Sequence, residues 1–149
     1  MTEYDFPECT SFGSVIRFAL ELEKAASNVY DELAGRPNLA SAQEPLKALS
    51  ETHRKRSELL EHTRREKLNE MILEPIQDLD SSSYVVETEV PEGLDMAGAK
   101  AFAGKIEETS SRFYVDSSKT AQSLLAEAAR ILDKMGKENE AIKAKLESL

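Results

Sequence analysis

A repeated pattern in this sequence places two glutamates where they could do chemistry. The pattern F-A-x-x-x-E-x-x-x-x-x-x-Y occurs twice, and in both copies a tyrosine follows the glutamate seven residues later. It covers residues 18–30 and 102–114 and places its polar residues at Glu23, Tyr30, Glu107 and Tyr114. Two inward carboxylates can bind a metal ion or pair with a buried cation.

Helical periodicity predicts that these polar residues point inward. Alternating steps of four and three residues define one apolar stripe in each copy. The two stripes are Phe12, Ile16, Ala19, Glu23, Ala26, Tyr30 and Leu33, and Ala103, Glu107, Ser110 and Tyr114. A buried carboxylate is costly unless something compensates it, so the functional question is what compensates Glu23 and Glu107.

Two further helical stripes carry polar residues at a comparable depth. They consist of Leu46, Leu49, His53, Arg56 and Leu60, and of Leu125, Ala129, Leu132, Gly136, Asn139 and Leu146. Aligning the two stripes matches His53 with Gly136 and Arg56 with Asn139. A glycine inside a helix costs roughly 1 kcal/mol relative to alanine. Gly136 therefore either makes room for a neighbouring side chain or a small ligand, or reflects drift at a position that has lost its role.

The helices that must position these residues are predicted from periodicity and from glycine and proline punctuation. They cover about residues 11–34, 40–73, 96–118 and 122–147, with a short turn at 119–121. The segment from about 74 to 95 interrupts the periodicity; fully extended, it spans about 70 Å. The sequence predicts one all-α domain over residues 1–149, a four-helix bundle of two related hairpins joined by a long crossover.

Composition and charge exclude some classes of partner. The formal net charge is -9, and the chain has no tryptophan, which disfavours nucleic-acid binding. The basic run within residues 53–67 is interleaved with glutamates and is typical of a solvated helix face. The sequence has neither a signal segment nor a membrane-spanning run, and its single cysteine fits a reducing compartment. We expect a soluble, cytoplasmic protein without a membrane partner.

The duplicated hairpin with its glutamate and tyrosine resembles the ferritin-like superfamily, most closely its rubrerythrin-like branch, over nearly the whole chain. In that family a glutamate from each of two helices, and a Glu-x-x-His from each of the other two, hold two metal ions. The resemblance places Glu23 and Glu107 at the two single glutamates. It places Tyr30 and Tyr114 at tyrosines close to the metal ligands.

The paired helices depart from the family pattern. Where Glu-x-x-His is expected, the chain has His53-Arg54-Lys55-Arg56 and Gly136-Lys137-Glu138-Asn139. Two divalent ions bring a charge of +4, whereas two carboxylates remain and Arg56 adds +1. The resemblance is therefore to a family member with a degenerate di-iron site, and a conventional di-iron centre is not expected.

Two hypotheses for the buried glutamates stay open at this point. In the first, Arg56 bridges Glu23 and Glu107 in place of the metals, and no cofactor is needed. This polar core cluster comprises Glu23, Tyr30, His53, Arg56, Glu107, Tyr114 and Asn139. We expect both tyrosines to hydrogen-bond carboxylates rather than to act in redox chemistry. In the second hypothesis, Glu23, His53 and Glu107 hold a single Fe, Mn or Zn ion.

These hypotheses lead to two classes of function. The first makes the protein a structural or binding module, expected to form a homodimer that buries an exposed helix face. The second, implied by the resemblance, is a metal-dependent oxidoreductase acting on oxygen, peroxide or iron. The chain has no C-x-x-C pair and so lacks a rubredoxin-type iron module. An oxidoreductase would then need a separate protein as its electron-transfer partner, and no catalytic residue can be assigned.

Overall fold

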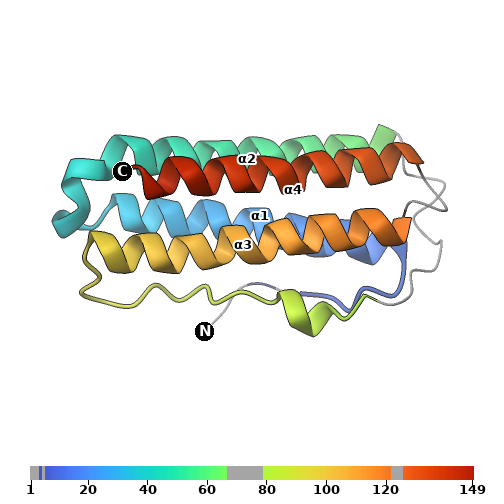
Figure 1. Ribbon diagram of the computed structural model, residues 1–149, viewed down its shortest axis with the longest axis horizontal. Helices are drawn as coiled ribbons and strands as arrows, with labels where there is room; N and C mark the ends of the chain where they lie inside the picture. The colour runs from blue at the N-terminus through green and yellow to red at the C-terminus, as the bar shows by residue number, and fades with distance from the viewer. Residues whose placement is uncertain (1–3, 5, 67–78, 122–125) are drawn as a thin grey trace.

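The computed structural model describes residues 4, 6–66, 79–121 and 126–149, and four α-helices dominate this part of the chain (Figure 1). They are α1 (Phe12–Ala34), α2 (Gln43–Glu66), α3 (Met96–Ala121) and α4 (Ala126–Glu147). In the described parts of the connections lie two short 3₁₀ helices, η1 (Pro37–Ala42) and η3 (Ser81–Tyr84). No β-strand occurs in the described residues, so the all-α prediction is confirmed and the helices form a four-helix bundle.

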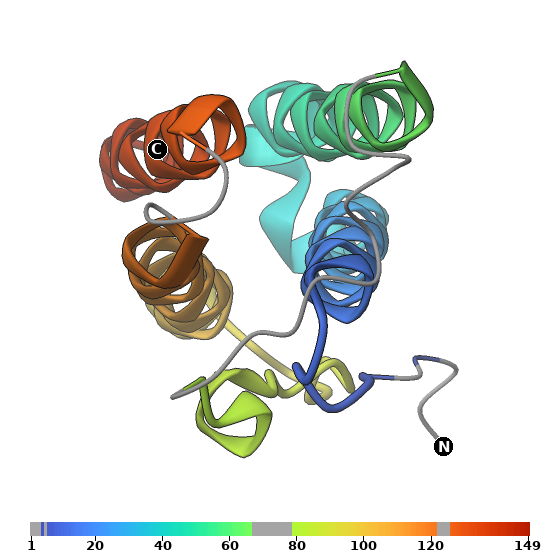
Figure 2. The same cartoon turned by 90° about the vertical axis from the view of Figure 1, so that its right-hand side faces the viewer.

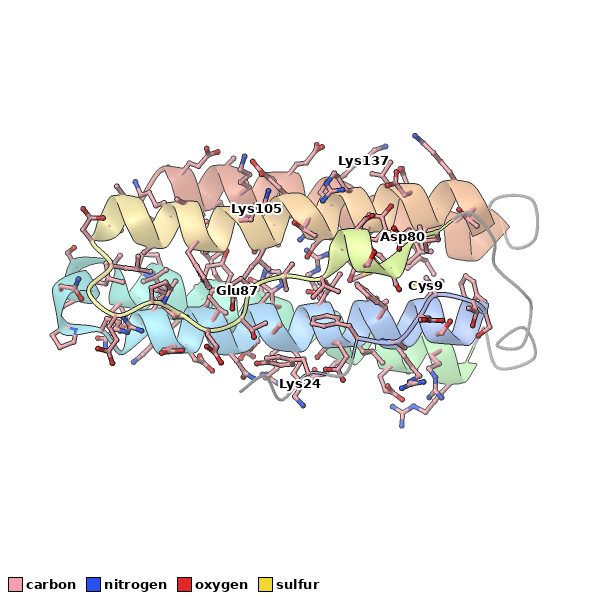
Figure 3. The ribbon with its side chains drawn as sticks, turned by 90° about the horizontal axis from the view of Figure 1, so that it is seen from below. Cys9, Lys24, Asp80, Glu87, Lys105 and Lys137 are labelled. Carbon is pink, nitrogen blue, oxygen red and sulfur yellow. The ribbon has the colours of Figure 1, made fainter. Side chains whose placement is uncertain are left out.

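The bundle consists of two antiparallel hairpins, α1 with α2 and α3 with α4 (Figure 1). Viewed end-on, α1 lies beside α3, and α2 lies beside α4 (Figure 2). Residues 79–95 run along the outside between α1 and α3, so that α3 begins at the end of the bundle where α1 finishes (Figures 1 and 3). This is the path expected of the crossover; its predicted first residues, 74–78, lie outside the described residues.

Local sequence signals explain where α1 begins and ends and where α2 begins. Ser11 caps α1 by accepting a hydrogen bond from the backbone of Ser14, whose side chain accepts from the backbone of Ser11. The N–H of Gly35 donates to carbonyls of the last turn, and Pro37 then opens η1. The second helix therefore begins at Gln43, slightly later than the expected residue 40, and its predicted portion 67–73 lies outside the described residues.

The turn predicted at residues 119–121 is wrong, because α3 continues as a helix through Ala121. This stretch contains neither glycine nor proline, so nothing in it breaks the backbone ladder. The hydroxyl of Thr120 donates to the carbonyl of Asp116, which is compatible with a continuing helix. Polar composition alone is thus a poor signal for a helix end.

The predicted inward stripes form the core. All their positions are buried except Leu125, which lies outside the described residues. Aromatic side chains fill the layer between α1 and α3, where the rings of Phe18 and Phe113 stack with centroids 4.8 Å apart. None of the described helices has the combination of length and apolar sequence needed to cross a membrane.

Gly136 allows α3 and α4 to approach each other closely. A Cβ atom built on Gly136 would lie 3.2 Å from the carbonyl oxygen of Ser111 and 3.3 Å from Cβ of Tyr114. The hydroxyl of Ser111 also donates to the carbonyl of Gly136 at 3.1 Å. Of the two interpretations from sequence, making room for a neighbour is the one that this packing supports. The neighbours are the carbonyl of Ser111 and the side chains of Val115 and Tyr114, all on α3.

Gly136→Ala should fail to give the stability that alanine normally adds to a helix. Gly104 provides a matched control, because a Cβ there would meet only the Cε of Lys143, at 3.8 Å. We expect Gly104→Ala to raise the free energy of unfolding by about 1 kcal/mol and Gly136→Ala to give no gain or a loss. Chemical denaturation of both variants measures the difference. Equal stabilisation by the two substitutions would contradict the close-packing account.

Candidate functional site

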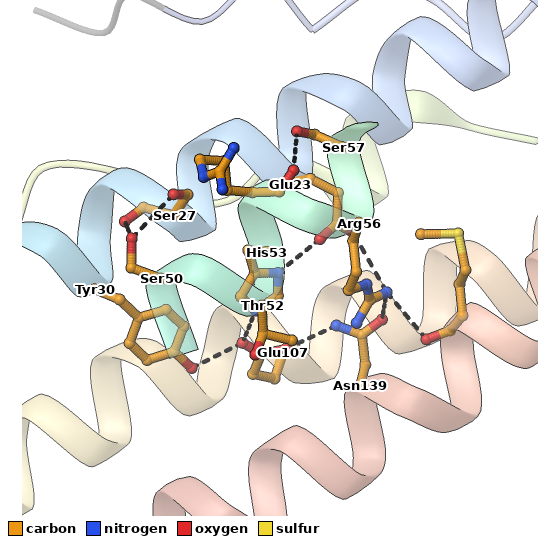
Figure 4. Close-up of polar contacts among 12 residues, drawn as sticks. Glu23, Ser27, Tyr30, Ser50, Thr52, His53, Arg56, Ser57, Glu107 and Asn139 are labelled. Carbon is orange, nitrogen blue, oxygen red and sulfur yellow. Dashed lines mark hydrogen bonds and ion pairs between the residues drawn. The ribbon is translucent and has the colours of Figure 1, made fainter. Parts of the chain in front are cut away.

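The seven residues of the polar core cluster lie in the core of the bundle, and every helix contributes to it. Figure 4 labels all of them except Tyr114. Six of the seven side chains are at most 1 % exposed, and Arg56 is 6 % exposed. Glu23 and Tyr30 come from α1, His53 and Arg56 from α2, Glu107 and Tyr114 from α3, and Asn139 from α4. The inward periodicity of the four stripes brings them together.

His53 lies directly between the two carboxylates. Its Nδ1 is 2.6 Å from Oε1 of Glu23, and its Nε2 is 2.6 Å from Oε2 of Glu107. Burial would lower the pKa of His53, but the charges and hydrogen bonds of Glu107 and Glu23 outweigh it and raise this pKa to about 9. At neutral pH, His53 is therefore an imidazolium that donates one hydrogen bond to each glutamate.

Arg56 does not bridge the carboxylates, so this part of the sequence hypothesis is wrong. Its Nη2 lies 3.3 Å from Oε2 of Glu23 and donates to Oδ1 of Asn139 at 2.7 Å and to the carbonyl of Met135 at 3.1 Å. Asn139 in turn donates to Oε1 of Glu107 at 2.7 Å. The position between the glutamates is taken by His53, one helical turn earlier. Arg56 therefore reaches Glu23 directly and Glu107 only through Asn139.

The guanidinium of Arg56 is only partly hydrogen-bonded. Among the described residues its Nε and Nη1 have no hydrogen-bond partner. Its Cζ lies 5.5 Å from the centroid of the Tyr114 ring, which gives it a cation–π contact. Burial would lower the pKa of Arg56, but the charge of Glu23 leads the effects that raise it, so Arg56 stays charged.

The two tyrosines pair with the glutamates of the opposite hairpin. Tyr30 donates to Oε2 of Glu107 at 2.7 Å, and Tyr114 donates to Oε2 of Glu23. This exchange follows from the antiparallel packing of α1 against α3, which sets the tyrosine of one copy opposite the glutamate of the other. Burial and the adjacent carboxylates raise the pKa of both phenols far above 10, so both remain protonated donors. The prediction that they are carboxylate partners is confirmed.

The charges of the cluster balance. Burial would raise the pKa of Glu23, but Arg56 and His53 outweigh it and lower this pKa below its ordinary value. Two carboxylates then face one imidazolium and one guanidinium, for a net charge of zero. Each of the four carboxylate oxygens accepts at least one hydrogen bond within the cluster. The buried glutamates are therefore compensated by side chains of this chain itself.

The donor set does not fit the two-metal centre that the resemblance implies. Oxygen and nitrogen ligands of one ion lie about 2.1 Å from it, and hence about 3 Å apart at right angles. The 2.6 Å spacings between His53 and the glutamates are hydrogen-bond distances, and both ring nitrogens are engaged. In the part of the chain that the structure describes, no group of three or more His, Cys, Asp or Glu residues is arranged to hold a metal ion.

Three polar groups near the cluster were not predicted. Ser27 and Ser50 lie 3.1 Å apart through their hydroxyls, and Ser50 donates to the carbonyl of Ser27 at 3.0 Å. These serines are four residues after Glu23 and three before His53, so the same helical spacing would have identified them. The carbonyl of Met135, which Arg56 contacts, has no sequence signal because every residue carries a carbonyl.

Comparisons of the chain with protein-family models, with curated proteins and with solved structures found no match. The ferritin-like resemblance therefore remains an expectation based on the residue pattern. Any function has to be inferred from the geometry of the polar core cluster and of the surface around it.

The protonation of His53 should make stability depend on pH in the alkaline range. A group whose pKa rises from 6.5 to about 9 on folding stabilises the fold fully below pH 6.5, and this contribution is lost as the pH rises through 9. We expect the free energy of unfolding to fall by on the order of 3 kcal/mol across that window. Denaturation at a series of pH values measures it. His53→Gln should flatten the slope, and an unchanged slope in that variant would contradict the assignment.

Proposed function

We propose that this chain is a ferritin-like bundle protein, related to rubrerythrins, in which an internal ion-pair network replaces the di-iron centre. In this proposal it acts as a structural or binding module and not as a redox enzyme. The cluster fixes the register of the four helices, because each helix supplies a side chain that only this arrangement satisfies.

One observation carries the proposal: each ring nitrogen of His53 lies 2.6 Å from a carboxylate oxygen. A metal ligand must offer a free nitrogen lone pair, whereas this imidazolium offers two N–H donors. Arg56 adds a second positive charge close to Glu23, which further opposes a bound cation. The positions of the two family glutamates, Glu23 and Glu107, support the ferritin-like ancestry of the fold.

A metal-dependent oxidoreductase acting on oxygen, peroxide or iron is the second candidate. Its specific support is that His53 contacts both Glu23 and Glu107, so the three candidate ligands for Fe, Mn or Zn are neighbours in the core. A metal would have to displace the proton from one ring nitrogen of His53 and separate that nitrogen from its carboxylate, while the other nitrogen could keep its proton. The first candidate requires no such rearrangement.

The expected homodimer remains part of the proposal. In the described ranges, Leu59 on α2 and Val85 in the crossover are the large apolar side chains with substantial exposure. They lie on separate elements, so each is a candidate for a different contact. Either a helix face or the crossover would supply the dimer interface.

Metal content separates the two candidate functions. We expect protein produced with added Fe, Mn and Zn to contain far less than stoichiometric metal, because His53 and Arg56 already neutralise both glutamates. Elemental mass spectrometry measures this beside Glu23→Gln/Glu107→Gln, which removes both negative charges at constant side-chain length. Stoichiometric metal that is lost in the double variant, together with an optical change on adding peroxide, would establish the oxidoreductase instead.

A further inference from the structure

A groove of about 620 Å³ lies between the C-terminal part of α3 and the facing part of α4. Its charged lining consists of four basic residues and one acidic residue, namely Lys119, Arg130, Lys134, Lys137 and Asp133. The whole chain has a formal net charge of -9. The groove is therefore a local positive site on a strongly acidic protein.

Most of this positive charge has no ion-pair partner among the residues that the structure describes. Lys137, on the outer side of the α3–α4 pair in Figure 3, lies 3.1 Å from Oδ2 of Asp133. Within residues 4, 6–66, 79–121 and 126–149, the structure gives no ion pair for Lys119, Arg130 or Lys134. These three side chains are exposed, so their N–H groups face solvent and are available to a ligand.

The excess of positive charge is largest in this stretch of the α3–α4 pair; a second groove is lined by Lys100, Lys105 and Lys143 together with Glu108 and Glu147. A third groove, of about 470 Å³, neighbours the first and is lined by Arg112 and Lys143 together with Glu107, Glu108 and Glu140. Lys143 is already paired with Glu108 at 2.6 Å. A long polyanion would have to pass these carboxylates, whereas a compact anion would not. The distribution of charge thus favours a small ligand.

The floor of the positive groove is apolar. Val115 and Ala129 lie among its lining residues, and the hydroxyl of Ser118 points inward, donating to the carbonyl of Ala129 at 2.7 Å. The volume falls in the range of small-molecule sites, about 300–1,000 Å³. A ligand with a charged end and an apolar or planar portion matches both the walls and the floor.

We propose that this groove binds a phosphorylated small molecule. Arg130 supplies a planar fork that suits phosphate oxygens, and Lys119 and Lys134 supply point charges. The organic portion of the ligand rests on Val115 and Ala129. The groove is separate from the polar core cluster, so its binding and the metal content of the core are tested independently.

Pyrophosphate and ADP are suitable probes, with adenosine as the uncharged comparison. Each is titrated into the full-length ¹⁵N-labelled chain at low ionic strength, where charge recognition is strongest. We expect saturable shifts of the amides at 115–119 and 129–137 with both phosphates and none with adenosine at the same concentration. Tighter binding of ADP than of pyrophosphate would show that the organic portion of the ligand contacts the apolar floor. Equal affinity would show that the groove recognises the phosphates alone.

Arg130→Gln/Lys134→Gln should weaken this binding about tenfold, from the loss of two charge contacts. The matched control is Lys47→Gln/Lys55→Gln, which removes the same charge from exposed positions of α2 and should change affinity by less than about twofold. The proposal is overturned if neither phosphate saturates or if the shifts map to another surface. An equal loss of affinity in both double variants would also overturn it, because attraction by net charge would then suffice.

Discussion

The fold depends on compensating two carboxylates that lie in the middle of its core. Glu23 and Glu107 are each at most 1 % exposed, and leaving either one unpaired would cost several kcal/mol. Their compensation requires groups from all four helices: tyrosines from α1 and α3, the two cations from α2 and an amide from α4. A shift of any helix by one residue would break several of these contacts together. The same groups that neutralise the charge therefore also specify how the helices align.

The two halves of the chain share the cluster unequally. Glutamate and tyrosine occur in both copies and pair reciprocally across α1 and α3. The other two helices are not equivalent. His53 on α2 lies between the two glutamates, whereas its counterpart on α4, Gly136, has no side chain. Arg56 and its counterpart Asn139 contact each other at 2.7 Å. The four helices are therefore arranged symmetrically, but the charges are not. The carboxylates come one from each hairpin, whereas both cations that neutralise them lie on α2.

Helical periodicity predicted which residues of this cluster face inward, because depth in a bundle follows from spacing along each helix. It did not predict the individual partners. Arg56 was assigned the bridging position that His53 occupies, since spacing gives the side of a helix and not the level at which a side chain ends. The end of α3 was also misplaced, because the stretch at 119–121 is polar but contains no residue that stops a helix. The path of residues 79–95 was predicted only in outline. The length of the segment and the direction of the helices indicate that it runs along the bundle, but they do not indicate where its side chains pack.

The protonation state of His53 tests the central claim most directly, since the balance of charges requires an imidazolium between two carboxylates. Nitrogen-15 NMR of the labelled histidine ring reports whether each ring nitrogen carries a proton. At neutral pH the account predicts that both nitrogens of His53 are protonated and that both remain so in metal-containing buffer. A bare nitrogen with the lone-pair signature of a neutral ring would contradict it, because the core would then need another cation to satisfy Glu23 and Glu107.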